Sequence, residues 1–349
     1  MSILLLGDAA AAASASTETP AWAWGVFGAL VVGMLAIDLF IFNRKAQTHG
    51  IRQALAWTVV WIALAALFGA GVHYVRGPHA ALEYATAYLV EKSLSIDNIF
   101  IFIVIFRYFG IPTVFQHRIL FWGILGALIM RGIMIGAGVQ LIEHFRGILY
   151  LFAAFLVFTG IKLFFHDDKS HDPSTSWAFR LTKRFVPMTK TLRDERFFVR
   201  EDGRLLATPL FLVLIVIEAT DLIFAVDSVP ACLGISHDLF IVYTSNIFAI
   251  LGLRALYFLL AGMMGELRFL KPALSIVLVY IGAKMLLAEL HHAEVAWAFK
   301  IPTGLSLGVV GGILTLAVAA SLLFPGKKPA PHAGGDLVPA SDLPAKHDA

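Results

Sequence analysis

Apolar runs about as long as a bilayer is thick recur along this sequence and constrain its fold more than any other feature. A transmembrane helix needs about 20 mostly apolar residues to cross the hydrocarbon core. Runs of this kind, separated by polar turns, lie at residues 22–43, 54–75, 81–106, 114–138, 147–165, 209–232, 238–263, 272–291 and 303–324. They predict an all-α, polytopic membrane helical bundle with about nine transmembrane helices.

Composition excludes several classes of protein. Hydrophobic residues make up 59% of the chain and charged residues only 15%, whereas soluble domains carry about 25% charged residues. The basic residues are spread among loops, so no nucleic acid is expected as a partner. A single cysteine, Cys232, excludes a disulfide framework or a thiolate metal cluster within the chain. The expected partner is the lipid bilayer, and protein partners stay open.

The positive charges predict the orientation of the chain, because Lys and Arg are retained on the cytoplasmic side. Outside the spans, nineteen Lys and Arg residues fall on one side and only Arg76, Arg146 and Lys300 on the other. We therefore expect a bacterial cytoplasmic (inner) membrane protein with its N-terminus outside and its C-terminus inside. Residues 22–325 would form the transmembrane domain with a cytoplasmic loop at 166–208, and the ends, 1–21 and 326–349, are predicted to be disordered.

Charged side chains inside the predicted spans are the strongest functional signal. Each central Asp, Arg or Lys costs about 2.5–3.5 kcal/mol, whereas a central Leu, Ile, Phe or Val returns only about 0.3–0.6 kcal/mol. Such groups persist when they pair, face a water-filled cavity or bind a substrate, and an internal salt-bridge network is the alternative to a functional site. The residues are Asp38, Glu91, Asp97, Glu218, Asp221 and Asp227, with Lys92, Arg131, Lys162, Arg254 and Lys284.

Two polar stretches, in the third and sixth spans, concentrate the oxygen atoms. At 100° per residue Glu91, Ser95 and Asn98 share one face of the third span, and Glu218 and Asp221 share a face of the sixth. Both stretches offer only oxygen ligands.

Asp227 falls about 180° from Glu218 on an unbroken helix. It can join the same site only if the sixth span unwinds near it. Pro230 removes the hydrogen bond to the carbonyl of Val226 and so allows a local break. A straight helix would contradict this hypothesis.

The charges recur in the same order in two sets of three spans. In the first set, Arg131 follows Asp97 by 34 residues, and the lysine of Gly160-Ile161-Lys162 follows Arg131 by 31. In the second set, Arg254 follows Asp221 by 33 residues, and the lysine of Gly282-Ala283-Lys284 follows Arg254 by 30. An odd number of spans forces the second copy to enter from the opposite side, so we expect a 3+3 inverted repeat, 81–165 and 209–291.

The repeat assigns expected roles to these charges. Transporters built from inverted repeats bind substrate near the midplane at the repeat interface, so Asp97 and Asp221 should face one another there. Arg131 and Arg254, with Lys162 and Lys284, would compensate the negative charge, although Lys162 is close enough to a span end to snorkel. Asp38 and Ser95 are candidates for a gate or ion path, and local structure is the alternative for Asp38.

The donor set favours hard divalent cations. Carboxylate, hydroxyl and amide oxygens suit manganese, magnesium or calcium, whereas zinc and copper sites usually recruit His or Cys. No histidine lies in the middle of a predicted span.

Over residues 25–325 the chain resembles the TerC family of integral membrane proteins, and four motifs carry this resemblance. The TerC family is a branch of the cation-transporter group that includes lysine and calcium/manganese exporters. The motifs are Glu91 to Phe102, Gly126 to Arg131, Glu218 to Ala231 and Ile281 to Met285. The resemblance implies manganese efflux, with associations to tellurium resistance and to alkaline or redox stress. It also implies a metal site made of Glu91, Asp97, Asn98, Glu218, Asp221, Asp227 and Ser228.

The sequence therefore predicts a transporter that exports a divalent metal cation, manganese, through an acidic midplane site, without a cofactor and without enzymatic activity. A membrane-embedded stress, tellurium-resistance or redox-modulating protein that moves no ion is the first alternative. An intramembrane aspartyl protease is a weaker one, because its G-x-G-D signature is absent at Asp97 and Asp221.

Overall fold

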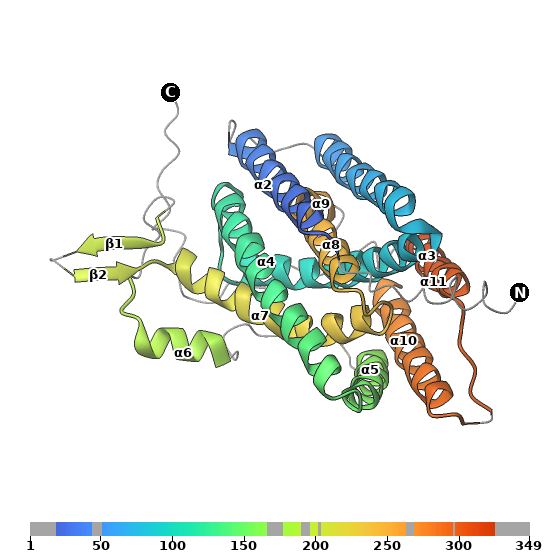
Figure 1. Cartoon of the computed structure of the whole chain (residues 1–349). Helices are drawn as coiled ribbons and strands as arrows, with labels where there is room; N and C mark the ends of the chain where they lie inside the picture. Colours follow the sequence, from blue (N-terminus) through green and yellow to red (C-terminus); the bar gives the residue numbers. More distant parts are fainter. Residues whose placement is uncertain are drawn as a thin grey trace, which may run out of the picture.

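Long α-helices form nearly all of the described structure (Figure 1). The computed structural model describes residues 19–43, 51–165, 177–189, 196–201, 204–262, 269–295 and 297–324. Its elements are α2 (Ala21–Asn43), α3 (Ile51–Tyr108), α4 (Thr113–His144), α5 (Ile148–Phe165), α6 (Trp177–Phe185), β1 (Phe198–Glu201), β2 (Arg204–Ala207), α7 (Pro209–Leu233), α8 (Leu239–Ile250), α9 (Leu253–Gly262), α10 (Leu270–His292) and α11 (Thr303–Leu323). The predicted disordered ends lie almost wholly outside the described residues.

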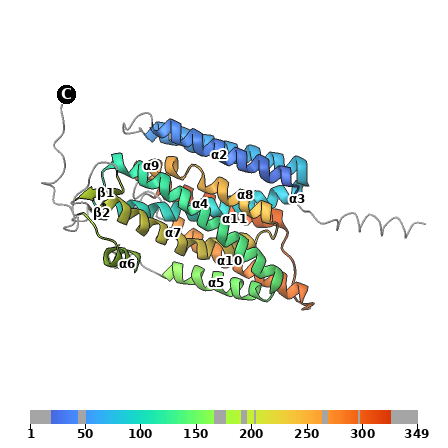
Figure 2. The same ribbon diagram turned by 60° about the vertical axis from the view of Figure 1, so that its left-hand side comes forward.

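The chain is an all-α polytopic membrane protein, as its apolar runs predict. Seven of the described helices are long and apolar enough to cross a membrane, and the bent pair α8–α9 makes an eighth candidate. The long helices run side by side along a common direction (Figure 2). The exact number of crossings stays a prediction.

Helix α3 is two arms joined at a sharp kink. At about 1.5 Å per residue its 58 residues would extend roughly 87 Å, far more than the roughly 30 Å hydrocarbon core. Gly77 has φ 87° and ψ 177°, which is not helical, and Pro78 follows it. A positive φ is readily adopted only by glycine. The kink therefore separates the two predicted spans 54–75 and 81–106.

The eighth candidate span is broken in its middle. Helices α8 and α9 meet at an angle of 40°, and between them Gly252 has φ 83°. The side chain of Trp61, on the first arm of α3, packs where a β-carbon of residue 252 would lie. The break therefore needs glycine for its backbone conformation and for its packing.

Gly252→Ala is expected to lower the free energy of unfolding by about 1–3 kcal/mol, because alanine is strained at positive φ and would collide with Trp61. Thermal unfolding of the purified protein in detergent measures the change. Gly312→Ala is the matched control, since Gly312 lies in α11 with open space around it. An equal loss of stability in the two variants would contradict the conclusion that the break needs glycine at position 252.

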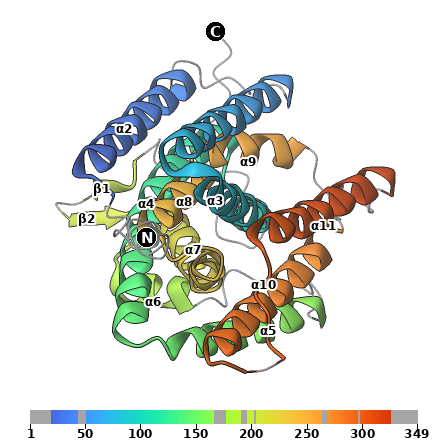
Figure 3. The ribbon, with the colours of Figure 1, turned by 45° about the vertical axis from the view of Figure 1, so that its right-hand side comes forward.

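Helices α5 and α10 pack side by side (Figure 3), and a glycine of each helix lies at their contact. A β-carbon at Gly160 would meet Ser275 and Val279, and one at Gly282 would meet Ala153 and Val157. In both helices the contacted residues lie seven and three positions before the glycine. The contact is therefore reciprocal, which is what two antiparallel helices related by a two-fold axis would show.

The segment between α5 and α7 contains structure that the sequence analysis leaves as a loop. Helix α6 packs beside α7, and β1 pairs with β2 in an antiparallel hairpin, with Phe198 opposite Ala207.

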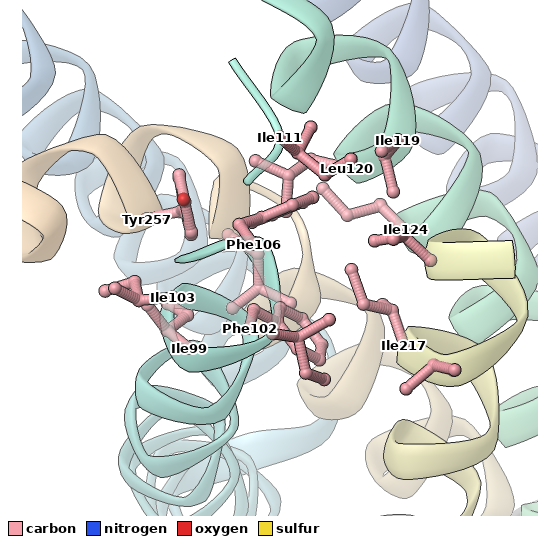
Figure 4. Close-up of a cluster of buried hydrophobic side chains, with 14 of the residues drawn as sticks. Ile99, Phe102, Ile103, Phe106, Ile111, Ile119, Leu120, Ile124, Ile217 and Tyr257 are labelled. Atoms are coloured by element: carbon pink, nitrogen blue, oxygen red, sulfur yellow. The ribbon is translucent and has the colours of Figure 1, made fainter. Parts of the chain in front are cut away.

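Two buried apolar clusters lie at different levels of the bundle. The first joins the end of α3, the start of α4, the start of α7 and α9, and part of it is shown in Figure 4, including Phe102, Phe106 and Ile217. The second joins the middle of α3 with the later parts of α4 and α7 and with α5 and α10. Along α3, α4 and α7, the stretches between the two clusters contain several of the span charges, namely Glu91, Lys92, Arg131, Glu218, Asp221 and Asp227.

Candidate functional site

A buried arginine on α4 joins carboxylates from two other helices. Arg131, only 2% exposed, forms an ion pair with Glu91 of α3. Its Nη2 lies 3.3 Å from Asp221 Oδ1 on α7, and its Nε lies 3.4 Å from Asp221 Oδ2. The predicted pairing of Arg131 with a span aspartate is therefore present at Asp221.

Polar side chains complete this cluster, which we call the Arg131 network. Arg131 Nη1 donates to Ser228 Oγ at 3.1 Å, and Asn98 Nδ2 donates to Asp221 Oδ1 at 3.2 Å. Cys232 Sγ donates weakly to Glu91 Oε2 at 3.7 Å. With two carboxylates and one guanidinium, the network carries a formal charge of −1 when all three groups are ionised.

Two further oxygen atoms beside the network have no hydrogen-bond partner among the described residues. They are Ser95 Oγ, on α3 between Glu91 and Asn98, and Glu218 Oε2, one helical turn before Asp221. A buried polar atom without a partner costs about 1–3 kcal/mol. Unpaired oxygen atoms next to a negatively charged network are suited to an incoming cation.

Gly126 makes room for Glu218. A β-carbon at Gly126 of α4 would overlap the Glu218 carboxylate. The sequence alone identifies Gly126 only as part of a motif, because close approach between two helices is a tertiary contact.

We expect Gly126→Ala to displace the Glu218 carboxylate. If the Arg131 network binds a cation, as proposed below, this displacement should weaken its affinity about tenfold, the equivalent of about 1.4 kcal/mol. The measurement is Mn²⁺ titration of the purified protein. Gly123→Ala serves as control, because a β-carbon there makes only ordinary contacts with Ile217 and Leu214. Unchanged affinity in Gly126→Ala would remove Glu218 from the site.

Asp97 cannot be placed relative to the network. Its backbone lies within α3, but its side chain lies outside the described residues. The expectation that Asp97 faces Asp221 therefore stays a prediction.

The hypothesis of a helix break near Asp227 is wrong. Helix α7 is continuous from Pro209 to Leu233, with Pro230 inside it. Asp227 consequently lies near Thr159 and Lys162 of α5, away from the Arg131 network. The break in this half of the chain lies instead at Gly252.

Lys92 is buried and forms a hydrogen bond close to the break at Gly252. Its Nζ donates to the carbonyl of Ala249 at 3.0 Å, near the end of α8. The last carbonyls of a helix lack partners within it, and a lysine there is favourable. Lys92 therefore has a structural contact that its sequence position does not reveal.

The remaining span charges lie apart from the network. Arg254 Nη1 lies 3.5 Å from Asp38 Oδ2, so this pair connects α9 with α2. Lys284 is buried near Glu83, whereas Lys162 is exposed and lies near Asp227 of α7.

No group of three or more His, Cys, Asp or Glu side chains is placed to hold a metal ion among the described residues. Of the seven predicted ligands, Asp227 lies away from the Arg131 network, and the side chain of Asp97 lies outside the described residues. Glu91 and Asp221 come together through Arg131, with Asn98 and Ser228 bound to the same network, and Glu218 stands beside them.

A family comparison covers the residues that carry this network. The model of the integral membrane protein TerC family matches residues 76–328. The chain belongs to the TerC family. The matched region begins at the kink of α3, so α2 and the first arm of α3 precede it.

Similar proteins occur in several bacteria. "Uncharacterized membrane protein STKORF319" of Myxococcus xanthus is 46% identical over 86% of this chain and 92% of that protein. "Putative membrane-bound redox modulator Alx" of Escherichia coli K12 is 46% identical over 84% of this chain and 92% of its own length. An uncharacterized membrane protein of Rickettsia bellii is 38% identical over 86% of this chain and 97% of its own length. No solved structure matches this TerC-family chain.

Proposed function

We propose that this TerC-family protein exports a divalent metal cation, manganese, through the bacterial cytoplasmic membrane, and that the Arg131 network is its binding site. The observation that supports this proposal most is the burial of two carboxylates, Glu91 and Asp221, from different helices around one arginine. Charges at this depth are costly and are typical of ion pathways.

In this mechanism Arg131 and the cation alternate as partners of the carboxylates. Without cargo, the guanidinium neutralises part of the charge of Glu91 and Asp221. When the guanidinium moves aside, these two carboxylates, with that of Glu218 beside them, offer the oxygen ligands that a hard cation prefers. The hydroxyls of Ser95 and Ser228 and the amide oxygen of Asn98 add further oxygen ligands. The two carboxylates balance the charge of a divalent ion.

The packing around the network supports alternating access. Apolar clusters lie on both sides of the network along α3, α4 and α7, as expected for a site closed to both membrane surfaces. The reciprocal contact of Gly160 and Gly282 supports, as part of this proposal, a 3+3 inverted repeat whose halves move against each other.

The alternatives find less support in the geometry. The name of the Alx relatives suggests redox modulation, but a single buried thiol, Cys232, forms no disulfide within its own chain. An aspartyl protease needs two aspartates that share a proton, whereas Asp221 pairs with Arg131.

Binding of Mn²⁺ to the purified protein tests the proposal, with free Mn²⁺ measured by its electron paramagnetic resonance signal. Loss of one charge that contacts the ion is expected to weaken binding at least about tenfold in Glu91→Gln. Glu143→Gln is the control, because Glu143 is exposed near the end of α4. Equal affinities in the two variants would contradict the site.

A further inference from the structure

Helix α6 presents an exposed apolar stripe that no described element covers. Trp177, Leu181 and Phe185 recur every four residues and so lie on one face. Their exposed fractions are 56%, 50% and 71%. The adjacent face, which carries Ala178, Phe179 and Thr182, is buried.

Basic side chains border the stripe on its other side. Arg180 and Arg184 are exposed, and each directly precedes a residue of the stripe, Leu181 or Phe185. Around the helix, a buried face, an exposed apolar face and a basic face therefore follow one another. Helices that lie in a membrane interface combine an apolar face with a neighbouring basic face in this way.

The position of α6 places the stripe at the level of a membrane surface. Helix α6 packs beside α7, and the ring of Phe179 lies 5.8 Å from that of Phe109, just after the end of α3. Figure 2 shows α6 nearly end-on next to the spanning helices, which run across the view. Its axis is therefore close to parallel with the bilayer plane.

We propose that α6 is an interfacial helix that inserts Trp177, Leu181 and Phe185 into the leaflet on its side of the membrane, while Arg180 and Arg184 bind anionic lipid headgroups. Tryptophan is enriched at this depth, and basic residues near the surface are attracted to anionic lipids. The helix would hold the segment between the two predicted repeats against the bilayer.

Spin labels on introduced cysteines in the full-length protein test this proposal. The native Cys232 is buried, so an unsubstituted chain reports background labelling. Leu181→Cys is compared with Arg180→Cys, its neighbour on the basic face, in nanodiscs that contain phosphatidylglycerol and phosphatidylethanolamine. Phe158→Cys, on the exposed face of α5, serves as the bilayer reference.

The ratio of collisions with oxygen to collisions with a water-soluble nickel complex should be at least about threefold higher at position 181 than at position 180, and close to that of Phe158→Cys. Equal ratios at positions 180 and 181 would overturn the proposal. So would spin–spin broadening at position 181, because it would show a second copy covering the stripe. If Leu181→Cys fails to fold, Phe185→Cys gives the same comparison.

The proposed binding of Arg180 and Arg184 to anionic lipid headgroups is tested by changing the lipid composition. In nanodiscs of phosphatidylcholine alone, the ratio of oxygen collisions to nickel collisions at position 181 should be lower than in nanodiscs with phosphatidylglycerol. Arg184→Gln should make the ratios in the two lipid compositions more similar. A ratio that is independent of lipid charge would overturn the headgroup assignment.

Discussion

Arg131→Gln is expected to lower the free energy of unfolding by about 3–5 kcal/mol, because it leaves the buried carboxylates of Glu91 and Asp221 without the guanidinium that pairs with both. Thermal unfolding in detergent with a chelator measures this loss. Arg146→Gln is the control, since Arg146 is exposed between α4 and α5 and should change stability by less than about 0.5 kcal/mol.

A metal rescue connects this loss of stability with the proposed function. If Mn²⁺ occupies the position between the two carboxylates, saturating Mn²⁺ should restore most of the melting temperature lost in Arg131→Gln, since a ligand that binds only the native state stabilises it. The double variant Arg131→Gln/Asp221→Asn should gain little from Mn²⁺. Equal rescue of both variants would place the ion elsewhere.

The positions of the spans are predictable from sequence because length and apolarity alone decide whether a helix crosses a bilayer. The face shared by Glu91, Ser95 and Asn98 is predictable too, since helical geometry is local. The pairing of Arg131 with Asp221 agrees with the expectation that span charges neutralise one another.

The helix break shows where local reasoning fails. Pro230 removes one hydrogen bond, yet α7 continues through it, because neighbouring groups in a bundle compensate such a loss. Gly252 breaks its span, while Gly308, Gly311 and Gly312 remain within α11. Gly252 has a positive φ, and Trp61 packs against it, which is a contact between distant parts of the chain.

Partner choice among the span charges is likewise a tertiary property. The recurring order of acid, arginine and lysine suggests equivalent roles for Arg131 and Arg254, but Arg254 pairs with Asp38 of α2. Helix α2 lies outside both predicted repeats, so no spacing within the repeats predicts this pair. Asp227 and Lys162 belong to different predicted repeats, and their proximity is likewise a contact between helices that spacing along the chain does not predict.

Asp221→Asn is expected to reduce manganese transport by at least about thirtyfold, because truncating a buried charge that is hydrogen-bonded costs about 2–5 kcal/mol and each 1.4 kcal/mol is tenfold. The asparagine keeps the size of the side chain but removes the charge that balances the ion. Asp227→Asn changes the same residue type on the same helix outside the Arg131 network, so it should retain most of the flux.

Manganese flux into everted membrane vesicles tests whether the protein exports manganese through a site that contains Asp221. Wild type, Asp221→Asn and Asp227→Asn are compared at equal amounts of inserted protein. Everted vesicles expose the cytoplasmic face, so an exporter loads them with Mn²⁺. We expect rapid loading by wild type and Asp227→Asn and no loading above empty vesicles by Asp221→Asn. Equal loading by Asp221→Asn and wild type, or no loading by wild type, would contradict it.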